Sequence, residues 1–191
     1  MTGVRREQLL EYRGVEVPDL IGDDCRLLFV GINPGLWTAA VGAHFARPGN
    51  RFYPALHRAG IVERLIDASA GMSDDDRDML CRSGVGITNV VARATATAAE
   101  LSADELRAGG TQLRARVADI GPRVVAVAGI TAYRSAFEIP RAVVGRQEER
   151  WDGAEVWVVP NPSGLNAHET VDSLAVAYGD AARAAGILEF D

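Results

Sequence analysis

Short runs of consecutive apolar residues recur along the chain and are separated by longer, more polar stretches. The apolar runs predict four strands, at about 26–31, 85–91, 124–129 and 155–160. The other stretches predict five helices, at about 50–60, 73–82, 102–120, 130–138 and 169–185. Strands that are apolar on both faces are typical of a parallel sheet covered by helices on both sides. The pattern therefore predicts an α/β fold, a three-layer α/β/α sandwich around a central, mainly parallel sheet.

The longest predicted helix carries clear signals at its ends and an unusual pair of residues inside. Ser102 and Glu105 form a capping box at its start, and Gly121 is placed to end it. Gly109 and Gly110 each cost about 1 kcal/mol of helix stability relative to alanine. We therefore expect this glycine pair to pack closely against a neighbouring segment.

Two predicted strands, the first and the last, run into similar Asn-Pro corners: Asn33-Pro34-Gly35 and Asn161-Pro162-Ser163-Gly164. Either corner alone is an ordinary turn, and the pair is more specific. Proline and glycine stop both strand and helix, so Asn33 lies just past a strand's carboxyl end. Ligands bind at that edge of open α/β sheets. We expect the crevice to be lined by residues 33–45, 89–93, 129–133 and 161–168.

Composition favours one globular domain with a full core, because the chain has 191 residues and 48% hydrophobic content. No apolar run is long enough for a membrane span, and Met1–Arg13 lacks the apolar core of a secretory signal. Cys25 and Cys81 form neither metal-ligand spacing nor a disulfide framework. We expect a reduced, cytoplasmic setting and no membrane partner.

The net charge of −6 argues against a protein that coats nucleic acid without specificity. Arginines cluster locally, at positions 47, 51, 58 and 64 and again at 141, 146 and 150, and solvated surface charge is the better interpretation for most of them. The run Asp74–Asp76 is better explained by the start of a helix than by a metal site.

Familiar catalytic motifs are missing from the sequence. It contains no dinucleotide-binding glycine motif, no phosphate-binding loop, no paired metal-ligand motif and no nucleophile elbow. The three histidines (His44, His57 and His168) are isolated. The expected crevice is built instead from amides, hydroxyls and an aromatic ring, which read heterocycle edges, orient water and stack on bases. We expect no metal and no cofactor.

Five ordered motifs carry a resemblance to a known family: Gly31–Leu36, Gly49–Tyr53, Gly86–Val91, Glu105–Gly110 and Asn161–Leu165. The chain resembles the mismatch-specific uracil-DNA glycosylase / thymine-DNA glycosylase family of the uracil-DNA glycosylase superfamily. The resemblance runs from about Asp19 to the carboxyl terminus. It implies one catalytic domain with that family's fold over residues 19–191 and an amino-terminal extension over residues 1–18.

In that family a base is flipped from the duplex into a pocket, where its glycosidic bond is hydrolysed without metal or cofactor. The resemblance implies that Asn33 holds the attacking water and that Leu165 is the wedge filling the vacated space. It places five residues around the flipped pyrimidine: Ile32, Thr38, His44, Phe45 and Asn89. It places five in the loop that enters the duplex: Ser163, Gly164, Leu165, Asn166 and His168. Among them, Phe45 stacks on the base, Asn89 faces its edge, and His44 shapes the pocket.

Two positions depart from some relatives. Some bacterial members have a lysine where this chain has Asn89, which leaves thymine excision open. After Gly-Leu some relatives have Ser-Arg, whereas this chain has Asn166-Ala167-His168. The arginine's contact with the duplex is then lost or taken over by His168 or Asn166.

The leading interpretation is a monomeric, monofunctional DNA glycosylase that removes uracil from duplex DNA, especially opposite guanine, and so starts base excision repair. The chain contains no lysine that could form a Schiff base. A non-enzymatic α/β module that binds a nucleotide or a protein is the alternative, and a hydrolase of free nucleosides is a third. Leu165 distinguishes them, because an apolar residue on an exposed loop suits a duplex wedge and harms a soluble module.

Overall fold

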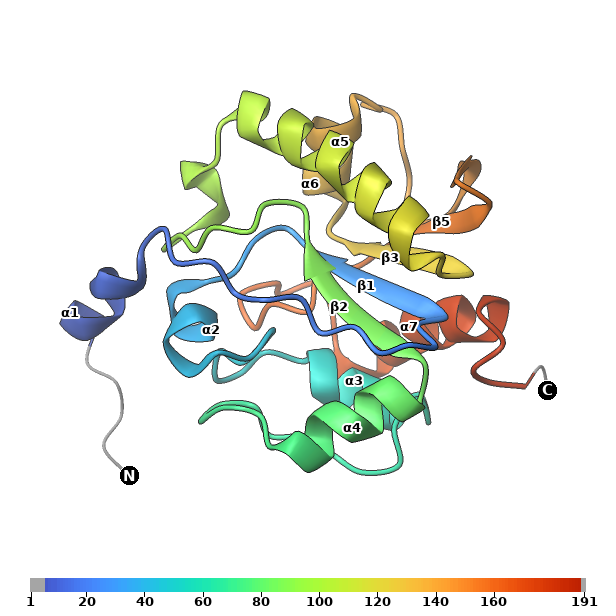
Figure 1. Cartoon of the computed structure of the whole chain (residues 1–191), viewed down its shortest axis with the longest axis horizontal. Coiled ribbons are helices and arrows are strands. Elements are labelled where there is room, and N and C mark those ends of the chain that lie inside the picture. The colour runs from blue at the N-terminus through green and yellow to red at the C-terminus, as the bar shows by residue number, and fades with distance from the viewer. Residues whose placement is uncertain (1–5, 190–191) are drawn as a thin grey trace.

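The computed structural model describes residues 6–189, and its five strands form one sheet in the order β2-β1-β3-β5-β4 (Figure 1). The strands are β1 (Leu27–Gly31), β2 (Val85–Asn89), β3 (Val124–Ala128), β4 (Gly145–Trp151) and β5 (Ala154–Val159). Every neighbouring pair is parallel except β4 with β5. Because β1 lies between β2 and β3, the chain crosses from one side of β1 to the other between those two strands.

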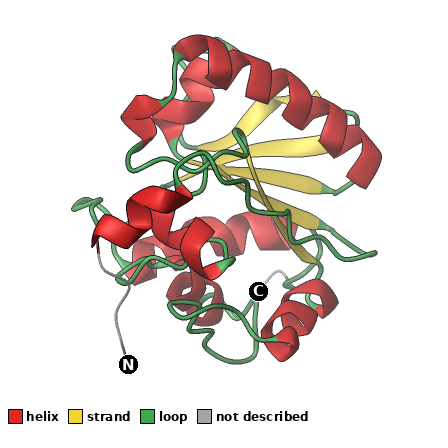
Figure 2. Ribbon diagram, turned by 60° about the vertical axis from the view of Figure 1, so that its left-hand side comes forward, coloured by secondary structure: helices red, strands yellow, loops and turns green. Residues whose placement is uncertain are grey.

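Helices cover both faces of this sheet (Figure 2). Helices α3 (Phe52–Arg58), α4 (Asp74–Arg82) and α7 (Val171–Ala184) pack on one face, and α5 (Ala103–Ile120) and α6 (Ile130–Phe137) on the other. The predicted three-layer α/β/α sandwich with a mainly parallel sheet is confirmed. All nine predicted elements are present, and no end differs from its predicted position by more than two residues.

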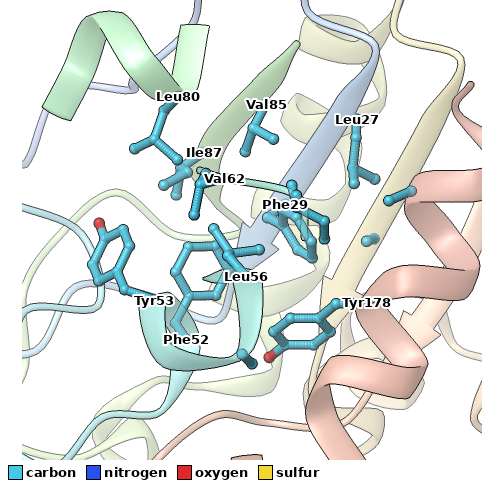
Figure 3. Close-up of a cluster of buried hydrophobic side chains, with 14 of the residues drawn as sticks. Leu27, Phe29, Phe52, Tyr53, Leu56, Val62, Leu80, Val85, Ile87 and Tyr178 are labelled. Atoms are coloured by element: carbon cyan, nitrogen blue, oxygen red, sulfur yellow. The ribbon is translucent and has the colours of Figure 1, made fainter. Parts of the chain in front are cut away.

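The face toward α3 and α7 holds one of the two aromatic clusters of the core (Figure 3). Phe29 of β1 packs edge-on against Phe52 of α3, with ring centroids 5.1 Å apart, and its centroid is also 5.1 Å from that of Tyr178 on α7. All three side chains are fully buried. The Tyr178 hydroxyl donates to the Pro160 carbonyl at 3.2 Å. This core ties α3 to β1 and ties the end of β5 to α7.

The sequence did not predict strand β4 or the short helix α2 (Leu36–Val41). Strand β4 reads Gly-Arg-Gln-Glu-Glu-Arg-Trp, which contains no apolar run. It pairs only with β5, at the edge of the sheet, where charged side chains remain in solvent and discourage pairing with other chains. Helix α2 has only six residues, too few for a helical pattern to be recognised.

Both glycines of α5 touch neighbouring backbone, which confirms the close packing predicted for them. A Cβ atom at Gly109 would lie 2.4 Å from the Val90 carbonyl oxygen, and one at Gly110 would lie 2.7 Å from that of Ala136. The capping box and the terminal glycine predicted for this helix are confirmed as well. Helix α5 is thereby held close to the segment that follows β2.

The described part of the amino-terminal segment, residues 6–18, packs against the rest of the fold. Helix α1 (Arg6–Leu9) and the 3-10 turn η1 (Leu10–Tyr12) lie beside α2 (Figure 1). Val17 is 6% exposed in a small apolar cluster with Leu36 and Ala94. Leu20 and Ile87 exchange two backbone hydrogen bonds, of 2.9 and 2.7 Å. The domain boundary at residue 19 stays a prediction, and it falls within a segment that is packed on both sides.

Candidate active site

A cavity of about 290 Å³ opens at the carboxyl ends of the parallel strands. It lies beside the end of β1, where the strand order reverses, which is the usual ligand position in open α/β sheets. Gly31, the last residue of β1, pairs in register with Asn89, the last residue of β2. Asn33 follows two residues later on the Asn-Pro corner. The sheet therefore brings the two predicted amides to the same edge.

Eight of the eleven predicted site residues line this cavity: Ile32, Asn33, Thr38, His44, Phe45, Asn89, Ser163 and Leu165. The other three, Gly164, Asn166 and His168, lie outside the lining. They belong with Leu165 to the segment from Ser163 to Glu169, called the 163–169 loop below. The fold thus gathers the predicted pocket residues around one cavity and places the predicted wedge at its rim.

The Asn33 side chain is held in one orientation by three acceptors. Its Nδ2 atom lies 3.1 Å from the Pro34 carbonyl oxygen, 3.0 Å from that of Arg93 and 2.7 Å from Thr95 Oγ1. The Thr95 hydroxyl itself donates to the Thr97 carbonyl at 2.8 Å, so its lone pairs face Asn33. Asn33 Oδ1 has no partner within residues 6–189. It remains available to accept a hydrogen bond from a molecule in the cavity.

Asn89 is oriented by His44. Its Nδ2 atom lies 3.2 Å from His44 Nδ1, and His44 Nε2 lies 2.9 Å from the Pro18 carbonyl oxygen. A carbonyl only accepts, so Nε2 carries the ring proton and Nδ1 of the neutral ring is an acceptor. Burial lowers the pKa of His44 and favours this neutral form. Asn89 therefore turns one N–H toward His44 and leaves Oδ1 and its second N–H for the cavity.

A second set of contacts holds the end of β2 in place. The Arg116 guanidinium donates to the Asn89 carbonyl at 2.7 Å and lies 3.6 Å from the Asp19 carboxylate. Asp19 also accepts from the Thr88 hydroxyl at 2.7 Å. These contacts fix the backbone of Asn89, so the side-chain orientation set by His44 has a rigid base.

Phe45 presents its ring to the cavity from a strained backbone. Its φ of 54° lies in the left-handed region, which costs about 1–3 kcal/mol for such a residue. The ring stacks on Phe52, with centroids 4.1 Å apart and planes at 24°. The Tyr53 hydroxyl donates to the His44 carbonyl at 2.7 Å and so holds the preceding residue. This geometry suits the predicted role of Phe45 as a platform for a base.

The 163–169 loop projects one apolar side chain. Leu165 is 76% exposed at the cavity rim. Asn166 turns inward, because its Nδ2 donates to the Asn161 carbonyl at 3.1 Å and its Oδ1 accepts from the His168 backbone N–H at 3.3 Å. The His168 side chain is exposed and has no partner in the part of the chain that the structure describes. Of the two predicted substitutes for the relatives' arginine, His168 is thus available and Asn166 is engaged within the loop.

Two predicted segments line the crevice only at their first residues. Of residues 89–93, only Asn89 lines the cavity, and Val90 is buried in the core. Tyr133, at the end of a segment expected to line the crevice, is fully buried and donates to the Glu149 carboxylate at 2.5 Å. It is the fourth residue of α6, and the helix turns its side chain back onto the sheet. Only the first residues of that segment, from Gly129 to Ala132, reach a hollow beside the cavity.

The arginine clusters are mostly engaged with other groups. Arg58 pairs with Asp172 at 2.8 Å, and Arg146 pairs with Glu155 at 3.2 Å. Both arginines are exposed, in line with the interpretation as solvated surface charge. Arg47 differs, because it lines the cavity and its side chain has no hydrogen bond or ion pair within residues 6–189.

Sequence reasoning missed part of the cavity lining, namely residues 95–98 together with Arg47 and Asn50. Thr95 is 1% exposed and lies in a segment without regular secondary structure. Its partner Asn33 lies 62 positions earlier. No local pattern marks such a pair, so no signal in the sequence could have identified it.

Residues 6–189 offer neither a metal-binding cluster nor a helix that could cross a membrane. Within residues 6–189, no group of three or more His, Cys, Asp or Glu side chains is arranged to hold a metal ion. Asp74–Asp76 form the first turn of α4, as predicted, and Ser73 caps that helix. Over the same residues, no helix has both the length and the apolar character needed to span a bilayer.

Comparisons with known proteins agree with the fold. The solution NMR structure of a proposed uracil DNA glycosylase from Methanosarcina acetivorans shares the fold, with a TM-score of 0.61 and 15% sequence identity. The superposition covers 92% of this chain and 98% of that one. The family model of the uracil DNA glycosylase superfamily matches residues 18–181. Since this match spans most of the sequence, the chain belongs to the uracil DNA glycosylase superfamily.

Proposed function

We propose that this protein is a monofunctional DNA glycosylase of the mismatch-specific uracil- and thymine-glycosylase type. Membership of the superfamily supports a uracil DNA glycosylase. The proposal adds that the substrate is uracil in duplex DNA, above all uracil opposite guanine, and that the base is flipped into the cavity. The protein acts as a monomer in the cytoplasm, uses neither metal nor cofactor, and starts base excision repair.

The observation that carries this proposal is a pair of amides whose orientations are fixed before any ligand binds. Asn33 Nδ2 faces three acceptors, and Asn89 Nδ2 faces the ring of His44. Each amide therefore offers its oxygen to the cavity, and Asn89 also offers one N–H. Groups that are held in place in this way need no reorganisation as charge develops in the transition state.

The Asn89 amide matches the edge of uracil. Uracil presents the acceptor O4 beside an N3–H donor, whereas cytosine presents an amino group beside an unprotonated N3. The free N–H of Asn89 can donate to O4 while Oδ1 accepts from N3–H. Cytosine requires the opposite amide orientation, which the acceptor on His44 opposes. Thymine has the same edge as uracil, so its excision depends on room for the methyl group.

The chemistry of Asn33 favours a dissociative reaction. A neutral amide accepts a hydrogen bond from water and orients it, but it does not take the proton. The base–sugar bond therefore breaks largely before water bonds to the anomeric carbon. Negative charge moves onto the departing base, where the N–H of Asn89 stabilises it. Phe45 as a stacking platform and Leu165 as a wedge offset the cost of unstacking the base.

The absence of lysine supports a monofunctional activity. A glycosylase that also cleaves the strand needs an amine nucleophile that forms a Schiff base with the sugar. All 20 lysine-plus-arginine positions in this chain are arginines, and a guanidinium stays protonated at every physiological pH. Water is then the nucleophile, and the product is an intact strand with an abasic site.

The test uses end-labelled duplexes with one G·U, A·U or G·T pair, a G·C control and a single strand with one uracil, all in EDTA. We expect excision from the G·U duplex, seen as strand cleavage only after alkali. No uracil excision from any substrate would contradict the proposal and favour a non-enzymatic binding module. A nick before alkali, or a complex trapped by borohydride, would contradict the monofunctional mechanism.

A further inference from the structure

Arg51 immediately precedes helix α3 and reaches across to the 163–169 loop, more than 110 positions later in the chain. Its guanidinium donates to three backbone carbonyls of that loop. They belong to Ser163 at 3.2 Å, Asn166 at 2.9 Å and Glu169. The side chain is half-buried. One cation thus holds both ends and the middle of the loop that carries Leu165.

The backbone around Arg51 supports the same loop. The Arg51 backbone N–H donates to the Pro162 carbonyl at 3.0 Å. Gly164 lies so close to Gly49 that a Cβ atom would be 2.5 Å from the Gly49 carbonyl oxygen. The loop therefore rests on residues 49–51 at its start, and the guanidinium secures it from there to Glu169.

Arginine has the right chemistry for this position. Carbonyl oxygens only accept hydrogen bonds, and the guanidinium offers five N–H donors in a planar fork. A lysine ammonium carries the same charge but concentrates its donors at one point, so it cannot reach three carbonyls spread along the loop. This position therefore requires the planar set of donors of a guanidinium, and a positive charge alone is not sufficient.

We propose that Arg51 is a positioning residue that preorganises the 163–169 loop, so that Leu165 stands clear of the surface before DNA binds. This inference rests on the proposed function, because a projecting leucine side chain is useful only to a protein that inserts it into a duplex. A wedge on a loose loop must be ordered during binding, and this entropy cost reduces the energy available to open the duplex. Loss of Arg51 should therefore impair excision from duplex DNA and largely spare excision from single strands.

A double-mutant cycle between Arg51→Gln and Leu165→Ala tests this coupling. Single-turnover excision rates are measured on a G·U duplex and on a single strand that contains uracil. We expect Arg51→Gln to slow duplex excision about tenfold and single-strand excision less than about threefold. In the Leu165→Ala background the same substitution should change the duplex rate less than about threefold, because the wedge is already absent. Fully additive effects would overturn the proposal.

Two further variants separate positioning from a phosphate contact. Arg51→Lys keeps the charge but not the fork, and we expect it to lose nearly as much duplex activity as Arg51→Gln. Arg58→Gln removes an exposed cation from the last position of α3, one that pairs with Asp172 at 2.8 Å, and should leave the duplex rate within about twofold. A wild-type rate for Arg51→Lys, or an equal loss for Arg58→Gln, would overturn the proposal.

Gly164→Ala perturbs the same loop without changing Arg51. It therefore tests the role of the loop even if the Arg51 variants fail to fold. Its Cβ would displace the loop from Gly49, and we expect the same loss confined to duplex substrate. Thermal unfolding sets an assay temperature at which every variant is folded. Equal losses on single and double strands in both variants would overturn the proposal. Failure of the proposed function is distinct, because wild-type protein would then excise uracil from neither substrate.

Discussion

His44 Nδ1 accepts a hydrogen bond from Asn89 Nδ2 at 3.2 Å, and this contact links the protonation of one residue to the orientation of the other. His44 Nε2 is committed as a donor to the Pro18 carbonyl at 2.9 Å. A second proton on the ring would turn Nδ1 into a donor, and the Asn89 amide would then have to offer its oxygen to His44. The cavity would face two N–H groups where the edge of uracil needs one donor and one acceptor.

Acidification should therefore slow uracil excision through His44. Burial lowers the pKa of His44 below its ordinary value near 6.5, with Arg77 acting in the same direction and the Pro18 carbonyl and Asp19 opposing it. The ring is neutral above this lowered pKa, so the single-turnover rate should hold at pH 6.5 and fall only below it. The free energy of unfolding should follow the same direction, because the unfolded chain binds a proton at His44 more readily than the folded protein does. The stability that neutral His44 contributes is complete above pH 6.5 and is lost as the pH falls through the lowered pKa.

His44→Asn provides the control for this pH dependence. Its side-chain oxygen can lie near the position of Nδ1 and accept from Asn89, but it does not titrate. The decline at acidic pH should disappear in this variant, and its rate at neutral pH should fall because the bond to Pro18 is lost. An unchanged acidic decline would show that another group is responsible.

Asn89 should matter more in the transition state than in binding. Asn89→Ala removes an N–H aimed at the developing anion, so we expect single-turnover excision from G·U duplex to fall by about 10–100-fold, or about 1.4–2.7 kcal/mol. Asn89→Asp should be slower still, because a carboxylate cannot donate and repels the leaving base. Duplex affinity, measured on an uncleavable analogue, should change little in either variant. An Asp variant as active as wild type would reduce Asn89 to a turn residue at a strand end.

Asn33→Ala should abolish most turnover and leave duplex binding nearly intact. Removal of a group that positions the attacking water is expected to cost about 10²-fold or more. Thr95→Val is the matched variant, since it preserves shape and removes one of the three acceptors that orient Asn33. Two acceptors remain, so its loss should be about tenfold at most. Wild-type rates in Asn33→Ala would assign this residue to the corner and refute the mechanism.

The sheet and its helices could be predicted because local chemistry determines them. The strands β1 and β3 are continuous apolar runs, β5 is apolar from Val156 to Val159, and α5 carries its own capping box and terminal glycine. Strand β4 could not be predicted, because its sequence is charged and its conformation comes from pairing with β5. The pairing with β5 determines this strand, and the residues of β4 show no strand pattern of their own.

The same division applies to the site. The corner after β1 and the end of β2 identify Asn33 and Asn89, since parallel strands bring their carboxyl ends to one edge. Asn33 is oriented by backbone carbonyls, such as that of Arg93, and by a hydroxyl in irregular structure. Asn89 is oriented by His44, whose ring is in turn held by the Pro18 carbonyl. Every residue has a carbonyl, so a sequence cannot indicate which one will accept a hydrogen bond from a distant side chain.

Leu165→Ala should impair excision from paired contexts more than from single strands, because only a duplex requires a wedge. Leu165 is 76% exposed, so its removal should leave the folded protein stable. We expect the loss to follow the order A·U greater than G·U greater than single strand, with at most a few kcal/mol for the best-paired site. Equal losses on single- and double-stranded uracil would contradict a wedge role.

Binding should weaken with salt, but with a shallow slope. Among the clustered arginines, Arg51 donates to loop carbonyls, Arg58 pairs with Asp172 and Arg146 pairs with Glu155. Arg47 and Arg141 have no side-chain partner within residues 6–189.

Each phosphate neutralised contributes about −0.9 to the slope of log K against log salt, so contacts from these two free arginines predict a slope of about −2. Arg47→Gln should make the slope shallower by about one unit, whereas Arg58→Gln should leave it unchanged. Binding of a G·U duplex titrated at several salt concentrations measures these slopes. A wild-type slope of about −6 or steeper would show a far more extensive basic footprint and contradict this prediction.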